Sequence, residues 1–273
     1  MFRFARSGTI EYLESEELSA QDFLTHAFCT RRCGVSRAPY DGLNTGDLVG
    51  DEEEDLLQNL NLVKDAFAIP DGRLILMRQL HGDRIYLIDE EGPLPDGLPE
   101  CDGLITDRPG VALGIRTADC VPLFFVDRTR RVIGAAHAGW RGTALGIAAR
   151  MVATLTERFS SRPEDILAVI GPAIGPCCYQ VDAPVLAAFS AVPDADLFFR
   201  PCPQKERWMV DLALANRLRI LAAGVPSENI YASGLCTSCR QDLFFSHRAA
   251  GGRTGRQISL IMLCDGGDAL KNA

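Results

Sequence analysis

The stretch that organises the fold is Ile115–Ala148, which reads IRTADCVPLFFVDRTRRVIGAAHAGWRGTALGIA. Its two apolar runs, Val121–Val126 and Val132–Ala138, are short and rich in branched and aromatic residues, as is typical of buried strands. The polar segment between them, Asp127–Arg131, is short enough to predict an antiparallel hairpin. Apolar residues then recur at helical spacing after Gly142, so we expect the unit to end in a helix.

Two residues with reactive side chains stand at the ends of these strands. Cys120 closes the sequence T-A-D-C before the first strand, and His137 lies in A-H-A-G-W-R-G at the end of the second. Binding and catalytic groups often occupy such positions, where a rigid scaffold holds them. A single cysteine in an apolar context is more often a small core residue, so neither residue alone establishes a site.

The rest of the chain predicts further strands and a few helices on both sides of this unit. The expected strands cover Thr9–Leu18 (with a turn), Phe23–Thr30, Leu74–Gln79, Arg84–Asp89, Gly103–Thr106, Ala112–Thr117, Ile166–Ile170, Asn229–Ser233 and Gln257–Leu263. The expected helices follow Asp51 up to Pro70, run from Asp182 to Ala188 and cover Asp211–Ala223, while Pro193–Arg207 looks irregular. The polar tail after Leu263 is expected to fray.

The order of these elements predicts the fold class. Strands cluster, and helices fall between or after them without strict alternation, which favours an α+β fold over a doubly wound parallel sheet. No repeat or linker divides the chain, so residues 1–273 are expected to form a single domain.

Composition limits the classes of function. With 273 residues, of which 47% are hydrophobic, the chain can bury a sizeable core. A net charge of −8 argues against a general nucleic-acid binder. The N-terminus has no apolar core of signal-peptide length, and no run reaches the ~18 apolar residues of a membrane span. We therefore expect a cytoplasmic protein without a membrane partner, whose ten cysteines are mostly reduced.

Three residues form a candidate metal site. The chain has only four histidines, and His81 and His137 both stand where a strand meets glycine. With Cys120 they make a set of three ligands from separate elements. A structural zinc site usually takes four protein ligands, whereas three leave the open position that zinc catalysis needs. Spacing alone does not decide whether the three side chains meet.

The remaining cysteines show no complete metal-binding pattern. Cys236 and Cys239 have the spacing of half a zinc ribbon, without a matching second pair. Cys177 and Cys178 are adjacent, so they are not expected to ligate one metal together. We therefore predict that Cys236 and Cys239 bind no structural metal.

Arginines recur beside glycine, serine or threonine at loop edges. They are Arg31, Arg116, Arg141, Arg248 and Arg256. Each alone would be a solvated surface residue. Together they could form an anion pocket, because guanidinium groups bind phosphate through two hydrogen bonds.

Five motifs carry a resemblance to a known family. They are R-Q-L-H-G at 78–82, T-A-D-C-V-P at 117–122, A-A-H-A-G-W-R-G at 135–142, G-P-A-I-G-P-C-C-Y at 171–179, and T-G-R at 254–256. The chain resembles the YfiH-like family, also called the laccase-domain or multicopper polyphenol oxidase family, from Thr30 to Leu263. In Thr30–Ser36 it departs from the family, which usually has glycine at the position of Cys33. Because glycine tolerates backbone angles that cysteine does not, the shape of this loop is in question.

The resemblance implies a fold, a metal and a reaction. The fold is a single domain of mixed sheets sandwiched together with helices packed outside. The metal is one zinc ion held by His81, Cys120 and His137, which are also the catalytic residues. The substrates are phosphate and the purine nucleosides adenosine, inosine and methylthioadenosine, with adenosine deamination as an accompanying activity. We expect Arg31, Asn44 and Arg141 to bind substrate; the first two lie in the loop that matches the family.

Other functions remain as alternatives. An older label for the family is copper-dependent polyphenol oxidation, but a multicopper mechanism needs many imidazoles and this chain has four. Copper could still occupy the same three ligands. A cysteine hydrolase would use Cys120 as nucleophile and His137 as base. A peptidoglycan-editing factor, or a binding module without catalysis at the cell-wall machinery, is the last alternative. A monomer is consistent with all of these.

Overall fold

The computed structural model describes residues 1–47, 49–88 and 92–264. The predicted strand end at Asp89 and the tail beyond Cys264 lie outside the described residues. The strands are β1 (Phe2–Ser7), β2 (Ile10–Ser15), β3 (Leu24–Cys29), β4 (Leu74–Ile75), β5 (Ile85–Ile88), β6 (Gly103–Thr106), β7 (Ala112–Thr117), β8 (Val121–Asp127), β9 (Val132–Ala138), β10 (Ile166–Ile170), β11 (Gln180–Val181), β12 (Phe199–Pro201), β13 (Trp208–Val210), β14 (Ile230–Ala232) and β15 (Gln257–Leu263). The helices are α1 (Glu16–Ser19), α2 (Glu53–Ala66), α3 (Trp140–Leu145), α4 (Ile147–Phe159), α5 (Ala183–Ala188), α6 (Ala195–Phe198) and α7 (Leu212–Ala222), with 3₁₀ turns at Pro163–Asp165 and Ser227–Asn229.

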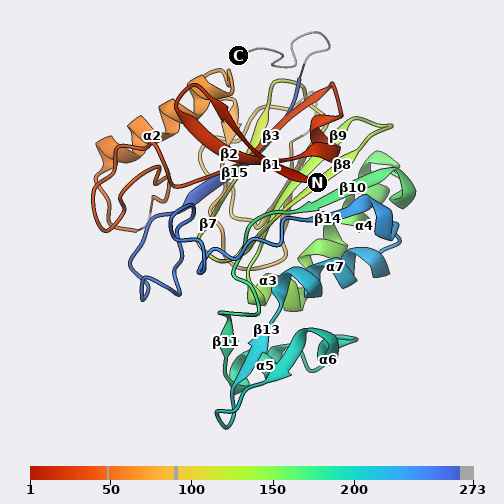
Figure 1. Ribbon diagram of the computed structural model, residues 1–273. Helices are drawn as coiled ribbons and strands as arrows, with labels where there is room; N and C mark the ends of the chain where they lie inside the picture. Colours follow the sequence, from red (N-terminus) through yellow and green to blue (C-terminus); the bar gives the residue numbers. More distant parts are fainter. Residues whose placement is uncertain (48, 89–91, 265–273) are drawn as a thin grey trace.

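Two mixed sheets pack face to face (Figure 1). One has the strand order β1-β2-β3-β15-β7-β4, and the other has the order β14-β10-β8-β9-β6-β5. Buried side chains from both sheets share one core, including Phe28 and Ile261 from the first and Phe124 and Val169 from the second. The α+β sandwich expected from the sequence is confirmed.

The central hairpin is buried on both faces. In β8, Leu123 and Phe125 join the core beneath the helices, whereas Phe124 and Val126 join the core between the sheets. Alternate residues of a strand point to opposite faces, so a strand covered on both sides needs apolar residues throughout. This explains why the two apolar runs show no polar alternation.

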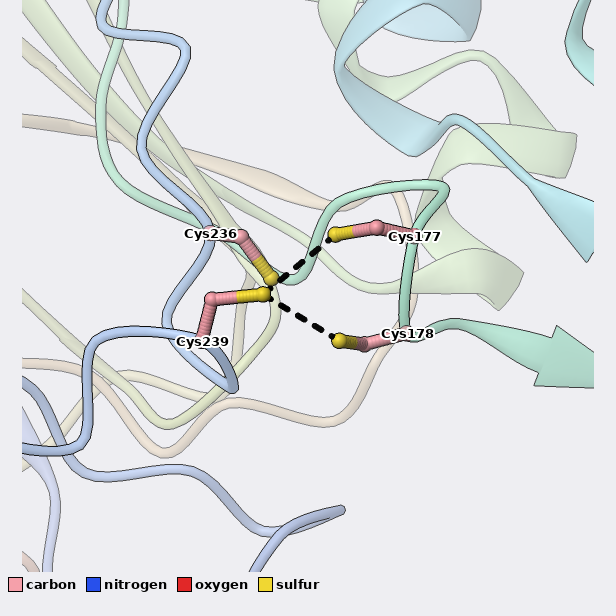
Figure 2. A group of neighbouring side chains, drawn as sticks. All are labelled: Cys177, Cys178, Cys236 and Cys239. Atoms are coloured by element: carbon pink, nitrogen blue, oxygen red, sulfur yellow. Dashed lines mark hydrogen bonds between the residues drawn. The ribbon is translucent and has the colours of Figure 1, made fainter.

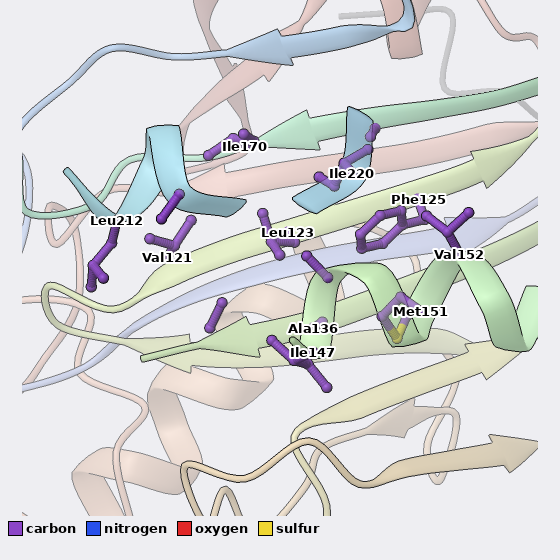
Figure 3. Close-up of a cluster of buried hydrophobic side chains, with 14 of the residues drawn as sticks. Val121, Leu123, Phe125, Ala136, Ile147, Met151, Val152, Ile170, Leu212 and Ile220 are labelled. Atoms are coloured by element: carbon purple, nitrogen blue, oxygen red, sulfur yellow. The ribbon is translucent and has the colours of Figure 1, made fainter. Parts of the chain in front are cut away.

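Helices cover the outer faces of the sandwich, as expected. Helix α2 packs on the first sheet through a core that includes Val63 and Phe67. Helices α4 and α7 cover the second sheet, where Met151 and Ile220 pack against the hairpin (Figure 3). A small sheet of order β11-β13-β12, with α5 and α6, projects below this layer (Figure 1).

The structure departs from the predicted elements at several places. The predicted strand Leu74–Gln79 is shortened to the two residues of β4. Strand β1 pairs along its length with β2, although its residues lack a buried face. The predicted helix after Gly142 divides into α3 and α4, because Gly146 adopts a left-handed φ of 88° between them. The segment Pro193–Arg207, expected to be irregular, contains α6 and β12. In the described part of the chain, every helix is too short or too polar to cross a bilayer.

Cys33 adopts a backbone conformation that glycine tolerates and that strains a cysteine. Its φ is +67°, in the left-handed region where a Cβ atom is strained. We therefore expect Cys33→Gly to raise the free energy of unfolding by about 1 kcal/mol. Urea denaturation would measure the change, with Cys33→Ala as the matched control, because alanine keeps the Cβ atom and should give no gain. Equal stability of the two variants would contradict the strain.

Candidate active site

The register of the central hairpin brings Cys120 and His137 together. Strands β8 and β9 pair antiparallel, with Val121 opposite Ala138 and Pro122 opposite His137. Cys120 directly precedes β8, so it lies at the same end of the hairpin as His137. The neighbouring Asp119 holds this corner: its two carboxylate oxygens accept hydrogen bonds from Thr237 Oγ1 at 2.7 Å and the Arg248 backbone N–H at 2.7 Å.

A buried carboxylate, Asp102, places His81. Asp102 directly precedes β6 and is fully buried. It accepts hydrogen bonds from the backbone N–H groups of Leu80, His81 and Gly82 at 3.1, 3.0 and 2.7 Å. His81 has a left-handed φ of 60°, which these bonds help to hold. The side chain of Asp102 therefore fixes the backbone of the loop that carries His81.

The same carboxylate orients His137. The backbone N–H of His137 donates to the Asp102 carbonyl oxygen at 2.8 Å, and its Nδ1 lies 2.8 Å from Asp102 Oδ1. Burial would raise the pKa of Asp102, but the hydrogen bonds from His137 and Gly82 lower it, so the group is ionised. An ionised carboxylate only accepts, so Nδ1 carries a proton, and Nε2 is the nitrogen that can give up its own proton and bind a metal.

His81, Cys120 and His137 converge. One ligand atom from each lies within 4.8 Å of the others, and the two imidazole rings stand nearly perpendicular with centroids 4.8 Å apart. Gly139 leaves room beside them: a Cβ atom there would lie 2.9 Å from His81 Cδ2 and 3.1 Å from Cys120 Sγ. Two imidazoles and a thiolate, with one histidine oriented by a carboxylate, fit a transition-metal ion. Their assignment as metal ligands and catalytic residues remains a prediction.

Without a metal, the charge of Cys120 and the charge of His137 depend on each other. Burial would raise the pKa of Cys120, but the adjacent His137 and His81 imidazoles lower it to about 6. Burial would lower the pKa of His137, but the Cys120 thiolate and the Asp102 carboxylate raise it to about 9. At pH 7–8 the pair is therefore a thiolate and an imidazolium.

This linkage predicts how metal affinity depends on pH. A metal requires Nε2 of His137 without its proton, so between about pH 6 and 9 binding should release one proton and affinity should rise about tenfold per pH unit. Below about pH 6 the Cys120 thiol must also lose its proton, so the dependence should steepen; above about pH 9 it should level off. Competition titrations against a chelator of known pH behaviour would measure this. A flat profile from pH 6 to 9 would contradict the charge state.

The three side chains open into a cavity of about 470 Å³. Four of the five arginines singled out in the sequence line it: Arg116, Arg141, Arg248 and Arg256. Arg116 is held by an ion pair with Asp47 at 2.9 Å. Within the described residues, the guanidinium groups of the other three pair with no carboxylate. Trp140 and Tyr179 add aromatic surface, and the Arg141 guanidinium lies 4.1 Å from the Trp140 ring centroid.

Arg31 and Asn44 are not among the residues that line this cavity. The Arg31 guanidinium pairs with Asp41 at 3.1 Å and lies 4.4 Å from the centroid of the Phe245 ring. Asn44 is fully buried; its amide donates to Asp51, and its Oδ1 accepts the backbone N–H of Arg256 at 2.8 Å. The substrate-binding role of both residues remains a prediction, and these contacts show how each also supports loop structure.

The premise that Cys236 and Cys239 have no second pair is wrong. Cys177 and Cys178 lie beside them, and the four Sγ atoms all fall within 4.8 Å of one another (Figure 2). Adjacent side chains point to opposite sides only where the backbone is extended. Here Cys177 and Cys178 lie in a tight turn, and both Sγ atoms point toward the other pair (Figure 2).

Sequence reasoning missed Asp102 and Gly139. Asp102 stands directly before a predicted buried strand, and an acid at such an edge is a usable signal for an orienting group. Gly139 directly follows His137-Ala138 in the motif A-A-H-A-G-W-R-G, but nothing local shows which side chains approach it.

Comparison with known proteins places this fold and site in a family. A family model described as multi-copper polyphenol oxidoreductase laccase matches residues 25–264, and the chain belongs to this family. It is 42% identical over 240 residues to purine nucleoside phosphorylase YlmD of Geobacillus stearothermophilus, covering 85% of this chain and 87% of that protein. Adenosine deaminase RL5, from an unknown prokaryotic organism, is 34% identical over 259 residues, covering 90% and 98%. The crystal structure of Bacillus licheniformis hypothetical protein YfiH superimposes with a TM-score of 0.88 at 39% identity, covering 96% and 98%.

Proposed function

We propose that this chain is a purine nucleoside phosphorylase that also deaminates adenosine, with zinc at His81, Cys120 and His137. One observation carries the proposal: a metal-type ligand set and three arginines without carboxylate partners among the described residues face one cavity. A volume of about 470 Å³ is within the range of small-molecule sites. The names of the relatives point to the same substrate class.

Different residues of the cavity would bind the phosphate and the purine base in phosphorolysis. Arg141, Arg248 and Arg256 supply positive charge for phosphate. Partial burial lowers the pKa of Arg256, whose half-buried guanidinium pairs with no carboxylate among the described residues. A bound anion would supply the missing charge. The aromatic surfaces of Trp140 and Tyr179 suit a purine base.

The metal-binding residues serve the reacting part of the substrate. A bound zinc ion would supply a Lewis acid that polarises an oxygen or activates water. Cys120 meets it as a thiolate, since its pKa is lowered to about 6. Asp102 holds the His137 ring in the orientation that presents Nε2. His81 is exposed, so this side of the site is open to substrate.

The remaining histidines weigh against a multicopper mechanism. His26 is buried away from the cavity, its Nε2 accepts the Ser15 backbone N–H at 2.8 Å, and burial lowers its pKa to about 3. His247 lines the cavity but is not part of the three-residue cluster. Three histidines near one site are too few for a type-1 copper and a copper cluster together.

The lowered pKa of Cys120 also suits the alternative of a cysteine hydrolase. A metal-bound thiolate is a poor nucleophile, so the two functions differ in reactivity toward iodoacetamide. Under our proposal, zinc should protect Cys120 from alkylation, and a chelator should expose it. Rapid alkylation of the zinc-loaded enzyme, with loss of a hydrolase activity, would favour the alternative.

The experiment that tests the proposal follows the products of adenosine by chromatography across a phosphate series. Phosphorolysis breaks the bond between C1′ and the base and forms a bond from C1′ to phosphate oxygen, releasing adenine. Deamination adds water to the ring and releases ammonia, giving inosine. One open metal position would not serve phosphate and water in a single substrate pose, so raising phosphate should increase adenine and decrease inosine.

Two variants distinguish one shared site from two separate sites. His137→Ala should abolish both activities, because it removes a shared ligand. Arg256→Gln should weaken the response to phosphate more than deamination. Inosine formation that ignores phosphate would contradict the shared site, and deamination that survives in His137→Ala would contradict the metal's part in it.

A further inference from the structure

Four cysteines outside the cavity's three-residue cluster form a second group of metal-type ligands. Cys177 and Cys178 come from the loop after β10, and Cys236 and Cys239 come from the loop after β14 (Figure 2). All four are free thiols, either exposed or half-buried, so an ion from solvent could reach them.

The distances between the sulfur atoms suit one small ion. Cys239 Sγ lies 3.6 Å from Cys177 Sγ and 3.4 Å from Cys178 Sγ, and all four Sγ atoms lie within 4.8 Å of one another. Four thiolates around zinc at about 2.3 Å form a tetrahedron with S–S edges of about 3.8 Å. The observed Sγ–Sγ distances therefore lie on both sides of the S–S distance expected for a tetrahedral site with a single ion.

Backbone hydrogen bonds hold the two loops that carry the four cysteines next to each other. Ala173 and Cys236 form an isolated parallel bridge, with hydrogen bonds from the Ala173 N–H to Leu235 and from the Thr237 N–H to Ala173. The Gly175 N–H donates to Cys236 Sγ at 3.2 Å. Backbone N–H donors to sulfur stabilise a thiolate and help to orient it as a ligand.

We propose that Cys177, Cys178, Cys236 and Cys239 bind one structural zinc ion. Four thiolates leave no open position, as is usual in structural rather than catalytic zinc sites. The ion would join two loops that are 61 residues apart between Cys178 and Cys239.

The position of the four-cysteine site connects it to the cavity. Ile174 and Tyr179 flank the first cysteine pair and line the cavity wall. Thr237, between the second pair, donates to Asp119, and the Ile174 N–H donates to the Asp119 carbonyl oxygen at 2.9 Å. Asp119 precedes Cys120, so an ion that joins the two loops also supports the corner that carries Cys120.

Metal analysis of a variant lacking the other site tests the proposal. The double variant Cys120→Ala/His137→Ala should retain one zinc ion per chain when purified without added metal. Adding Cys236→Ser should reduce the content to zero, whereas adding Cys202→Ser, at a half-buried cysteine outside the group, should leave it at one. These readings do not depend on phosphorolysis, so they stand or fall separately from the proposed function.

Cobalt binding provides a second measurement, which needs no substitution among the four cysteines. In the double variant, Co²⁺ should produce the strong thiolate-to-metal absorption of a four-sulfur site, and zinc should displace it. Zinc loading should also protect four thiols from a thiol reagent. Absence of zinc and of this cobalt spectrum, or a disulfide from Cys239 to Cys177 or Cys178 in protein purified with reductant, would overturn the proposal. Iron in place of zinc would overturn the assignment of the ion.

Discussion

Replacing Asp102 with asparagine is expected to weaken metal binding at His81, Cys120 and His137 by about 10- to 100-fold. The carboxylate accepts four hydrogen bonds, from three backbone N–H groups of residues 80–82 and from His137 Nδ1. An asparagine amide has one oxygen, so its NH₂ group must face donors. If it faces His137, the ring loses its partner for Nδ1–H; if it faces residues 80–82, backbone N–H donors there lose their acceptor.

Chelator competition at fixed pH measures the affinity of the Asp102→Asn variant, and nucleoside turnover should fall with it. Asp127→Asn is the matched control. Asp127 is an equally buried carboxylate at the opposite end of the β8–β9 hairpin. Its Oδ1 accepts the N–H groups of Thr129 and Arg130, and its Oδ2 has no partner among the described residues. An amide fits there, so the control should keep its affinity. Wild-type metal affinity in Asp102→Asn would show that Asp102 does not orient the ligands.

Gly139→Ala is the second change with a large expected effect. The Gly139 backbone, at φ −71° and ψ 173°, is open to any residue, so alanine introduces no backbone strain. Its Cβ atom would nevertheless crowd His81 and Cys120 at 2.9 and 3.1 Å. A displacement of the ligands by a fraction of an ångström to an ångström can reduce turnover by about 100-fold.

Metal content and kcat of the Gly139→Ala variant are the measurements. Gly82→Ala is the control beside the same site, because a Cβ atom there meets only Asp102 Oδ2 at an ordinary 3.5 Å. It should keep metal and most activity, and both variants should melt near the wild-type temperature. Full activity in Gly139→Ala would show that the ligands can move aside at little cost.

Local pattern was sufficient for the fold class and for two of the three candidate metal ligands. The apolar runs on both sides of Asp127–Arg131 predict an antiparallel hairpin, and that pairing places Cys120 and His137 at one end. Short-range turn chemistry and strand periodicity carry this information, because the pairing partners are close in the chain. The lack of alternation between strands and helices similarly favours the α+β class over a doubly wound sheet, whereas the sandwich arrangement came from the family resemblance.

Only the tertiary structure decided which distant loops meet. His81 joins the site through backbone bonds to Asp102, and no periodicity in residues 78–82 encodes that contact. The bridge between Ala173 and Cys236 brings together two cysteine pairs that sequence reasoning kept apart. Arg248 and Arg256 reach the cavity, while Arg31 pairs with Asp41 in its own loop. The meetings of His81 with Asp102, of the two cysteine pairs, and of Arg248 and Arg256 with the cavity depend on packing between segments far apart in the chain, whereas sequence pattern reports what neighbouring residues do to one another.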